Sequence, residues 1–146
     1  MATSDIIFKQ GKFMKNNSEN VGFGKYGKTF QEGLVQLIYD DRPFADQITE
    51  VLNINFLELE YLRVFVNKIL DYRTKYSIHP STEAITTILN TDLERESEVI
   101  QRQVRDYFRK IQYRELTDID YIKEQSLDFC RKQNLKEAMM KSVALL

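Results

Sequence analysis

The sequence is poor in the residues that build disulfides, metal sites and tight turns. Its 146 residues include no Trp, one Cys, one His and two Pro, and none of its five Gly lies beyond Gly33. The single Cys130 excludes an internal disulfide framework, and the single His79 excludes a metal site built on several histidines. No apolar run approaches the roughly 18 residues of a membrane span, and the N-terminus lacks the layout of a secretory signal. We therefore expect a soluble cytoplasmic protein without a metal site.

Charge gives little sign of a general nucleic-acid binder. The 21 Lys and Arg against 22 Asp and Glu leave a net charge of −1, whereas nucleic-acid-binding domains usually carry a basic excess. One basic cluster is interleaved with aromatic residues and consists of Arg102, Arg105, Arg109, Lys110 and Arg114. It could contact phosphate or an acidic partner, but a solvated helix face is the commoner role of such a run. We expect at most weak contact with DNA.

The missing glycines predict the fold class. A β-sandwich needs several turns with positive φ, which Gly and Asn usually supply, yet residues 34–146 contain no Gly and only Pro43 and Pro80 as helix breakers. Apolar residues recur there at spacings of three and four, which is typical of amphipathic helices. The sequence therefore predicts an all-α fold. The expected helices cover about residues 30–40, 43–52, 57–76, 81–91, 93–113 and 117–146.

The same glycine distribution divides the chain into two regions. Residues 1–29 contain all the glycines but Gly33 and show no helical or strand periodicity, which predicts an irregular, flexible arm. Residues 30–146 are expected to be a helical domain, with a subdomain over 30–91 and a helical hairpin over 92–146. A short connection between long helices favours antiparallel pairing. The expected architecture is a compact bundle of about six helices that ends in this long antiparallel hairpin. Its last helix runs through the apolar residues Ile122, Phe129, Leu135, Ala138, Met139 and Val143.

Residues 22–29 match the Walker A pattern of phosphate-binding loops. The matching positions are Gly22, Gly27, Lys28 and Thr29. In a true site, glycines let backbone N–H groups surround phosphate, Lys reaches the terminal oxygens, and Thr binds Mg²⁺. Such a loop leaves a buried strand, but the residues before Gly22 are polar and no later segment supplies a parallel sheet. We therefore interpret the motif as a decoy and expect no nucleotide site in it.

Diffuse apolar patterns further along the chain resemble a known family. They comprise residues 44–52 (FADQITEVL), 57–72 (LELEYLRVFVNKILDY) and 77–81 (SIHPS), preceded by 23–32 (FGKYGKTFQE) and followed by 129–140 (FCRKQNLKEAMM). Together they resemble the N-terminal domain of DnaB-like replicative DNA helicases, most closely the phage-type versions. The polar lead before Gly22 has no counterpart in that pattern.

The resemblance implies a role in assembly. The chain would then be a non-catalytic N-terminal domain that associates into dimers or a hexameric ring collar and docks primase or a helicase loader, in the cytoplasm of a bacterial host. ATP and Mg²⁺ would be bound only by a motor domain beyond residue 146. The resemblance places the interface on the hairpin. Because aromatic residues and Met are enriched at interface cores, the interface candidates are Tyr107, Tyr113, Tyr121 and Met140.

Two other function classes stay open from the residues alone. One is a nucleotide-binding protein that uses residues 22–29 as a phosphate loop. The other is a small phage protein that binds and redirects a host factor, which would have the same composition. A catalytic thiol is a weaker reading still, because Cys130 would need His79 as its base.

Overall fold

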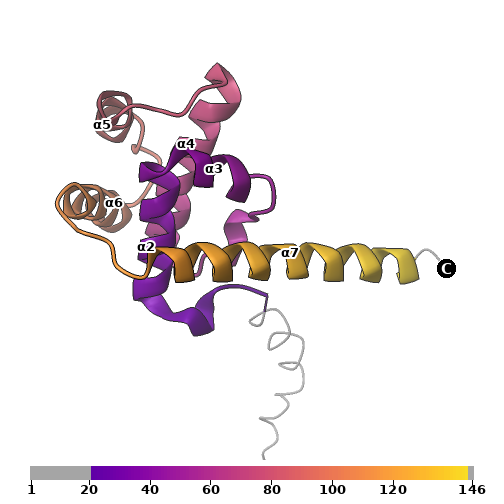
Figure 1. The fold of residues 1–146 in the computed structure, drawn as a ribbon. Coiled ribbons are helices and arrows are strands. Elements are labelled where there is room, and N and C mark those ends of the chain that lie inside the picture. The colour runs from indigo at the N-terminus through magenta and orange to yellow at the C-terminus, as the bar shows by residue number, and fades with distance from the viewer. Residues whose placement is uncertain (1–20, 145–146) are drawn as a thin grey trace, which may run out of the picture.

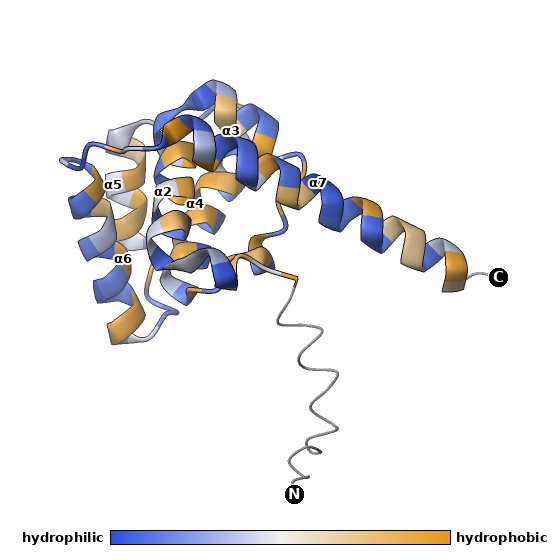
Figure 2. Cartoon of the chain, turned by 60° about the horizontal axis from the view of Figure 1, so that its bottom comes forward, coloured by the Kyte–Doolittle hydropathy of each residue, from blue (hydrophilic) through white to orange (hydrophobic). Residues whose placement is uncertain are grey.

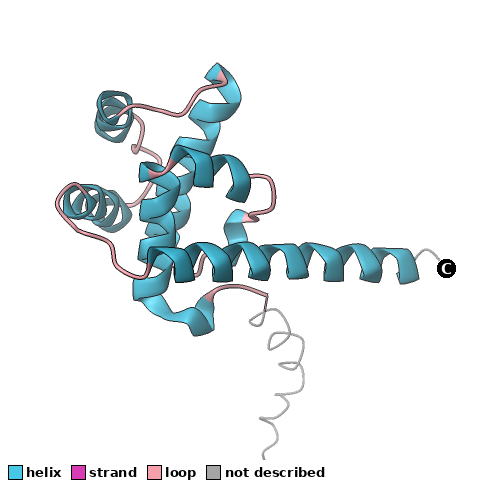
Figure 3. Ribbon diagram, in the orientation of Figure 1, coloured by secondary structure: helices cyan, strands magenta, loops and turns pink. Residues whose placement is uncertain are grey.

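The computed structural model describes residues 21–144, and this part of the chain contains six α-helices, two short 3-10 helices and no strand (Figures 1 and 3). The all-α prediction is therefore confirmed for these residues. The elements in chain order are η1 (Gly24–Tyr26), α2 (Gly27–Asp40), α3 (Arg42–Ile48), η2 (Ile54–Phe56), α4 (Glu60–Tyr76), α5 (Thr82–Thr91), α6 (Glu98–Ile111) and α7 (Ile119–Ala144).

Short polar side chains fix where several of these helices begin. The Asp41 carboxylate accepts a hydrogen bond from the Phe44 N–H at 3.0 Å, and Ser81 caps α5 in the same way through the Ala84 N–H at 3.1 Å. Ser97 caps α6 through the Ile100 N–H at 3.2 Å. This cap explains why α6 begins at Glu98 and not near Leu93, as its apolar spacing suggested.

Helix α2 is the centre of the fold. Every residue from Phe30 to Tyr39 is buried, and α3, α4 and α7 all pack against the helix. The crossing with α7 is close at Gly33, where a Cβ atom would stand 2.9 Å from Ile122 Cδ1. Buried polar groups usually find partners inside the protein, and Gln31, Glu32 and Gln36 make hydrogen bonds to neighbouring segments, while the buried Gln36 Oε1 has no partner within residues 21–144.

The ordered body begins earlier than expected. Phe23 has no exposed surface, and its ring lies 4.6 Å from that of Phe129 and 6.2 Å from that of Phe56. The arm was expected to reach residue 29, so its last residues belong instead to the core and to the start of α2. Its residues 1–20 lie outside the described part of the chain.

The last two helices do not form the expected hairpin. Helix α6 packs on α4, whereas α7 runs across α2 and α3, so that Figure 1 shows α6 nearly end-on and α7 along its length. The connection between them is held against α2, because the Gln36 side-chain amide donates to the Arg114 carbonyl at 3.0 Å. The apolar face of the first half of α7, which includes Ile122 and Phe129, then completes the core beside α2. Its second half extends past the body (Figures 1 and 2).

Candidate functional site

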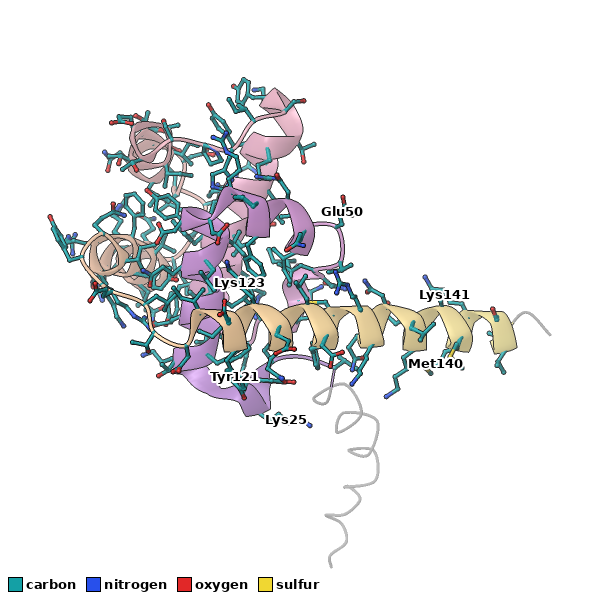
Figure 4. The ribbon with its side chains drawn as sticks, viewed as in Figure 1. Lys25, Glu50, Tyr121, Lys123, Met140 and Lys141 are labelled. Atoms are coloured by element: carbon teal, nitrogen blue, oxygen red, sulfur yellow. The ribbon has the colours of Figure 1, made fainter. Side chains whose placement is uncertain are left out.

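The projecting end of α7 is the most exposed apolar part of the described chain. Asn134 donates a side-chain hydrogen bond to the Val51 carbonyl at 3.0 Å, and every residue from 135 to 144 is exposed. Four large apolar side chains there are 60–69% exposed: Leu135, Met139, Met140 and Val143. We call residues 131–144 the distal segment; Figure 4 shows Met140 and Lys141 on it, beyond the body of the protein.

These side chains form a stripe. Leu135, Met139 and Val143 follow one another at intervals of four residues, which places them on one side of a helix, with Met140 about 100° further round. In a monomer, large apolar residues usually appear singly on the surface, and a contiguous group marks an interaction site. We call Leu135, Met139 and Val143 the apolar stripe.

Charge changes sign along α7. The distal segment carries Arg131, Lys132, Lys136 and Lys141 against Glu137 alone. The first half of the helix instead exposes three acids at intervals of four, which we call the acidic face: Asp120, Glu124 and Asp128. Leu135 comes seven residues after Asp128, so the acidic face leads into the apolar stripe on the same side of the helix. Asp128 and Lys132 form an exposed ion pair of 3.0 Å at the boundary.

The structure separates the interface candidates into two groups. Tyr113 is 87% exposed after α6, Tyr121 is 56% exposed at the start of α7, and Met140 lies in the distal segment. Tyr107 is buried, and its hydroxyl donates to the Glu32 carbonyl at 2.6 Å, so its selection as a surface residue was wrong. Residue type alone could not separate Tyr107 from the other two tyrosines.

The three members of the apolar stripe were not singled out as surface residues. Leu135, Met139 and Val143 have the same i, i+4 spacing as core residues of other helices, and they continue the run of apolar residues that begins with Ile122. The missing signal is the position at which α7 leaves the body. Asn134 bonds α7 to the body just before the helix leaves it, and a polar residue there is only a weak sign of that position in the sequence.

Three N–H groups of the phosphate-loop motif already bond within the fold. The Phe23 N–H donates to the Phe56 carbonyl at 2.7 Å, and the Tyr26 and Gly27 N–H groups donate to carbonyls within the segment. Gly22 allows this close approach, since a Cβ there would stand 2.8 Å from the Phe56 carbonyl oxygen. A phosphate loop needs such N–H groups directed at its ligand, whereas here these three serve a turn that places Phe23 in the core and leads into α2.

The basic cluster of α6 is largely used inside the protein. Lys110 forms a 2.8 Å ion pair with Glu32, and Arg114 lies 3.5 Å from the same carboxylate. Arg105 donates to the Leu89 carbonyl at the end of α5, and Arg109 pairs with Asp106 at 2.8 Å. Four of the five cations therefore have partners within the fold, which leaves a weak case for a phosphate-binding surface on α6.

Glu32 is the most buried carboxylate of the described chain. Burial raises its pKa, but hydrogen bonds from Lys110 and from the Tyr61 hydroxyl outweigh burial, so that the pKa lies below its usual range. Burial and the same contact with Glu32 raise the pKa of Tyr61. This network joins α2, α4 and α6. Both carboxylate oxygens of Glu32 already accept hydrogen bonds in it, so the role of Glu32 is structural.

His79 and Cys130 do not form a catalytic pair. Cys130 is buried in α7, and burial raises the pKa of its thiol to about 12, so the nucleophilic thiolate is suppressed. The two ring nitrogens of His79 instead bond to Arg73 and to the Tyr39 carbonyl. Among residues 21–144 no group of three His, Cys, Asp or Glu side chains could hold a metal ion.

Comparison with models of known families, with curated proteins and with solved structures gave no match to this chain. In the described part of the chain, no helix combines the length and the apolar character that crossing a bilayer requires.

Proposed function

We propose that this chain is a non-catalytic assembly domain that associates with a second copy of itself through the distal segment of α7. The observation that carries the proposal is the apolar stripe, held 60–69% exposed on a helix that extends past its own core. Burying one Leu or Met side chain is worth about 1.5–3 kcal/mol. A helix that presents several such residues in a row is suited to packing against another helix.

The charges of α7 favour a second copy as the partner. If two α7 helices pack antiparallel, the basic distal segment of each meets the acidic face of the other, and unlike charges lie opposite each other at both ends. Tyr121 lies about five turns before Met139 on the same side of the helix, and an antiparallel register that sets these two residues opposite each other would bring an aromatic ring against a thioether, a favourable contact.

The resemblance in the sequence gives this proposal its biological setting. In a DnaB-like replicative helicase, such a domain would form the collar of a ring and carry a docking surface for primase or a loader, while ATP would be bound by a separate motor. Supporting this view, Phe23 of the Walker-like segment is buried and its N–H donates to the Phe56 carbonyl, and Lys110 of α6 pairs with the buried Glu32.

Self-association is tested by size-exclusion chromatography with light scattering at tens of micromolar chain. We expect a dimer or larger assembly for the wild type and a monomer for Leu135→Asp/Met139→Asp, because two charges would enter the packed stripe. Val99→Asp is the matched control, since Val99 is 54% exposed on α6, away from the stripe. A monomeric wild type, or a double variant that assembles like the wild type, contradicts the proposal.

A further inference from the structure

A hollow of the described surface lies between α3 and the C-terminal end of α4. It encloses about 560 Å³ and is open to solvent. Its wall is polar on the α3 side and partly apolar near residues 70 and 78. The side chains that matter for its chemistry are Arg42, Asp46, Arg73, Ile78 and His79. We call it the α3–α4 groove, and it is separate from the distal segment of α7.

Hydrogen bonds fix the state of the histidine in this groove. The Arg73 guanidinium donates to His79 Nδ1 at 2.8 Å, and because a guanidinium is only a donor, Nδ1 must be the unprotonated nitrogen. Nε2 therefore carries the proton and donates to the Tyr39 carbonyl at 2.8 Å. His79 is thus a neutral ring wedged between α2 and α4.

The charges that surround His79 are unbalanced. Arg73 faces the ring from α4, and Arg42 and Asp46 face it from α3. Burial lowers the pKa of His79, its bond to the Tyr39 carbonyl opposes this, and the two arginines lower the pKa further. With His79 neutral, two guanidinium groups stand against one carboxylate, so the groove has an excess of one positive charge.

Both arginines have N–H donors left that can bind an anion. A guanidinium has five N–H donors, and the hydrogen bonds of Arg73 within residues 21–144 engage one acceptor on His79 and one on Asp46. None of the ion pairs among the described residues involves Arg42. Asp46 is 61% exposed, so its carboxylate sits at the mouth of the groove, where an incoming anion can displace it.

We propose that the α3–α4 groove binds the carboxylate of an acidic, apolar peptide segment of a partner protein, with the carboxylate held between Arg42 and Arg73. Arginine forks match carboxylates in paired N–H···O geometry. Ile78, which is 53% exposed at the rim, offers an apolar contact to a neighbouring side chain of the same segment.

Protein suits the groove better than nucleic acid. A phosphate backbone needs a track of several cations, but Asp46 and Glu50 follow Arg42 along α3 and the turn after it, where Glu50 is exposed (Figure 4). The repeated charges of a nucleic-acid strand would meet these acids. A short peptide can place one carboxylate on the arginines and an apolar side chain on Ile78.

The experiment uses His79 as its own reporter, because it is the only histidine of the chain. The imidazole C–H signals of the full 146-residue chain are followed by proton NMR during titration with a capped hexapeptide of alternating Glu and Leu. We expect a saturable shift and a higher pKa of His79 in the complex, since a bound carboxylate offsets the field of the arginines. A peptide with Gln in place of Glu should leave the signals unchanged.

Three variants assign the binding to the proposed groups. Arg42→Gln should weaken peptide binding by about fivefold or more. Asp46→Asn should tighten it by about two- to fivefold, because the competing internal carboxylate is removed. Arg102→Gln, an arginine of α6 outside the groove, should leave it unchanged. Far-UV circular dichroism and thermal melts establish that each variant is folded.

Several results would overturn the inference. They are no saturable shift, an equal response to the Gln peptide, no tightening in Asp46→Asn, or tighter binding of inorganic phosphate or oligothymidylate than of the acidic peptide. The inference stands apart from self-association. A monomeric Leu135→Asp/Met139→Asp chain should bind the peptide as the wild type does, so either idea can fail alone.

Discussion

Glu32 shows how a single charged residue can hold a helical core together. Its carboxylate accepts from the Tyr61 hydroxyl and from Lys110, while the Tyr107 hydroxyl donates to its backbone carbonyl. Three helices thus meet at one residue of α2. A buried carboxylate is stabilising only while its partners are present, so this contact specifies how α4 and α6 sit on α2.

Replacing this carboxylate should make the free energy of unfolding less dependent on pH in the acidic range. Because the pKa of Glu32 is lowered in the folded state, its contribution is present above the unfolded pKa and is lost as the pH falls through the folded pKa. We expect Glu32→Gln to lower the free energy of unfolding by about 1–3 kcal/mol at neutral pH, and the difference from the wild type to shrink on acidification below about pH 4.

Urea denaturation monitored by circular dichroism at several pH values measures this difference. Asp106→Asn is the matched control, because its pair with Arg109 is more than half exposed and should contribute under about 0.5 kcal/mol. A Glu32→Gln difference that stays constant from neutral to acid pH would show that the ionised carboxylate is not the stabilising form.

At the scale of elements, the crossing of α2 and α7 decides the shape of the domain. Gly33 lets α7 lie close to α2, with Ile122 over it. Packing there directs α7 across the body and away from α6. The small residue at this position therefore contributes to where the second half of α7 emerges.

A larger side chain at this crossing should loosen it. We expect Gly33→Val to lower the free energy of unfolding by about 1–3 kcal/mol, because its branched side chain would overlap both Ile122 and Leu116. Gly33→Ala should change stability much less, since Ile122 Cδ1 is the movable end of a side chain and Ala favours the helix by about 1 kcal/mol over Gly. Chemical denaturation of the two variants tests this order, and a Val variant as stable as the Ala variant contradicts it.

The elements themselves were largely predictable from local patterns, and their packing was not. Pro43, Ser81 and the apolar spacing within residues 57–76 place helices close to where they occur, because caps and periodicity act over a few residues. The direction of α7 depends on Gln36 binding the Arg114 carbonyl, a contact between residues far apart in sequence. The same limit applies to the candidate site. Periodicity identifies the stripe of Leu135 and Met139 but cannot say whether anything covers it.

At the scale of the whole molecule, α7 divides into an anchored half and a projecting half of opposite charge. Antiparallel pairing of two copies uses both halves at once, and it makes a prediction that simple hydrophobic association does not. Reversing the charge of one half in every copy should weaken assembly. Mixing a chain reversed in its distal segment with a chain reversed in its acidic face should restore it.

Two variant chains test this directly. Lys132→Glu/Lys136→Glu makes the distal segment acidic, and Glu124→Lys/Asp128→Lys makes the acidic face basic. Each alone should self-associate about tenfold more weakly than the wild type, because like charges then face each other at both ends of the pair. An equimolar mixture should assemble like the wild type in sedimentation velocity. Undiminished self-association of each variant would reject the antiparallel register while leaving the apolar stripe as the interface.

The continuity of α7 also means that the distal segment is ordered before a partner binds. An isolated peptide of the distal segment's length is a poor helix in water, because the first turn must fix several residues for one hydrogen bond. Here the anchored half has already nucleated the helix, so each distal residue only extends it, and Ala138, Met139 and Met140 are strong helix formers. The loss of conformational entropy on ordering the distal segment thus accompanies folding of the domain and not binding of a partner. An incoming partner meets a recognition element already in its bound shape.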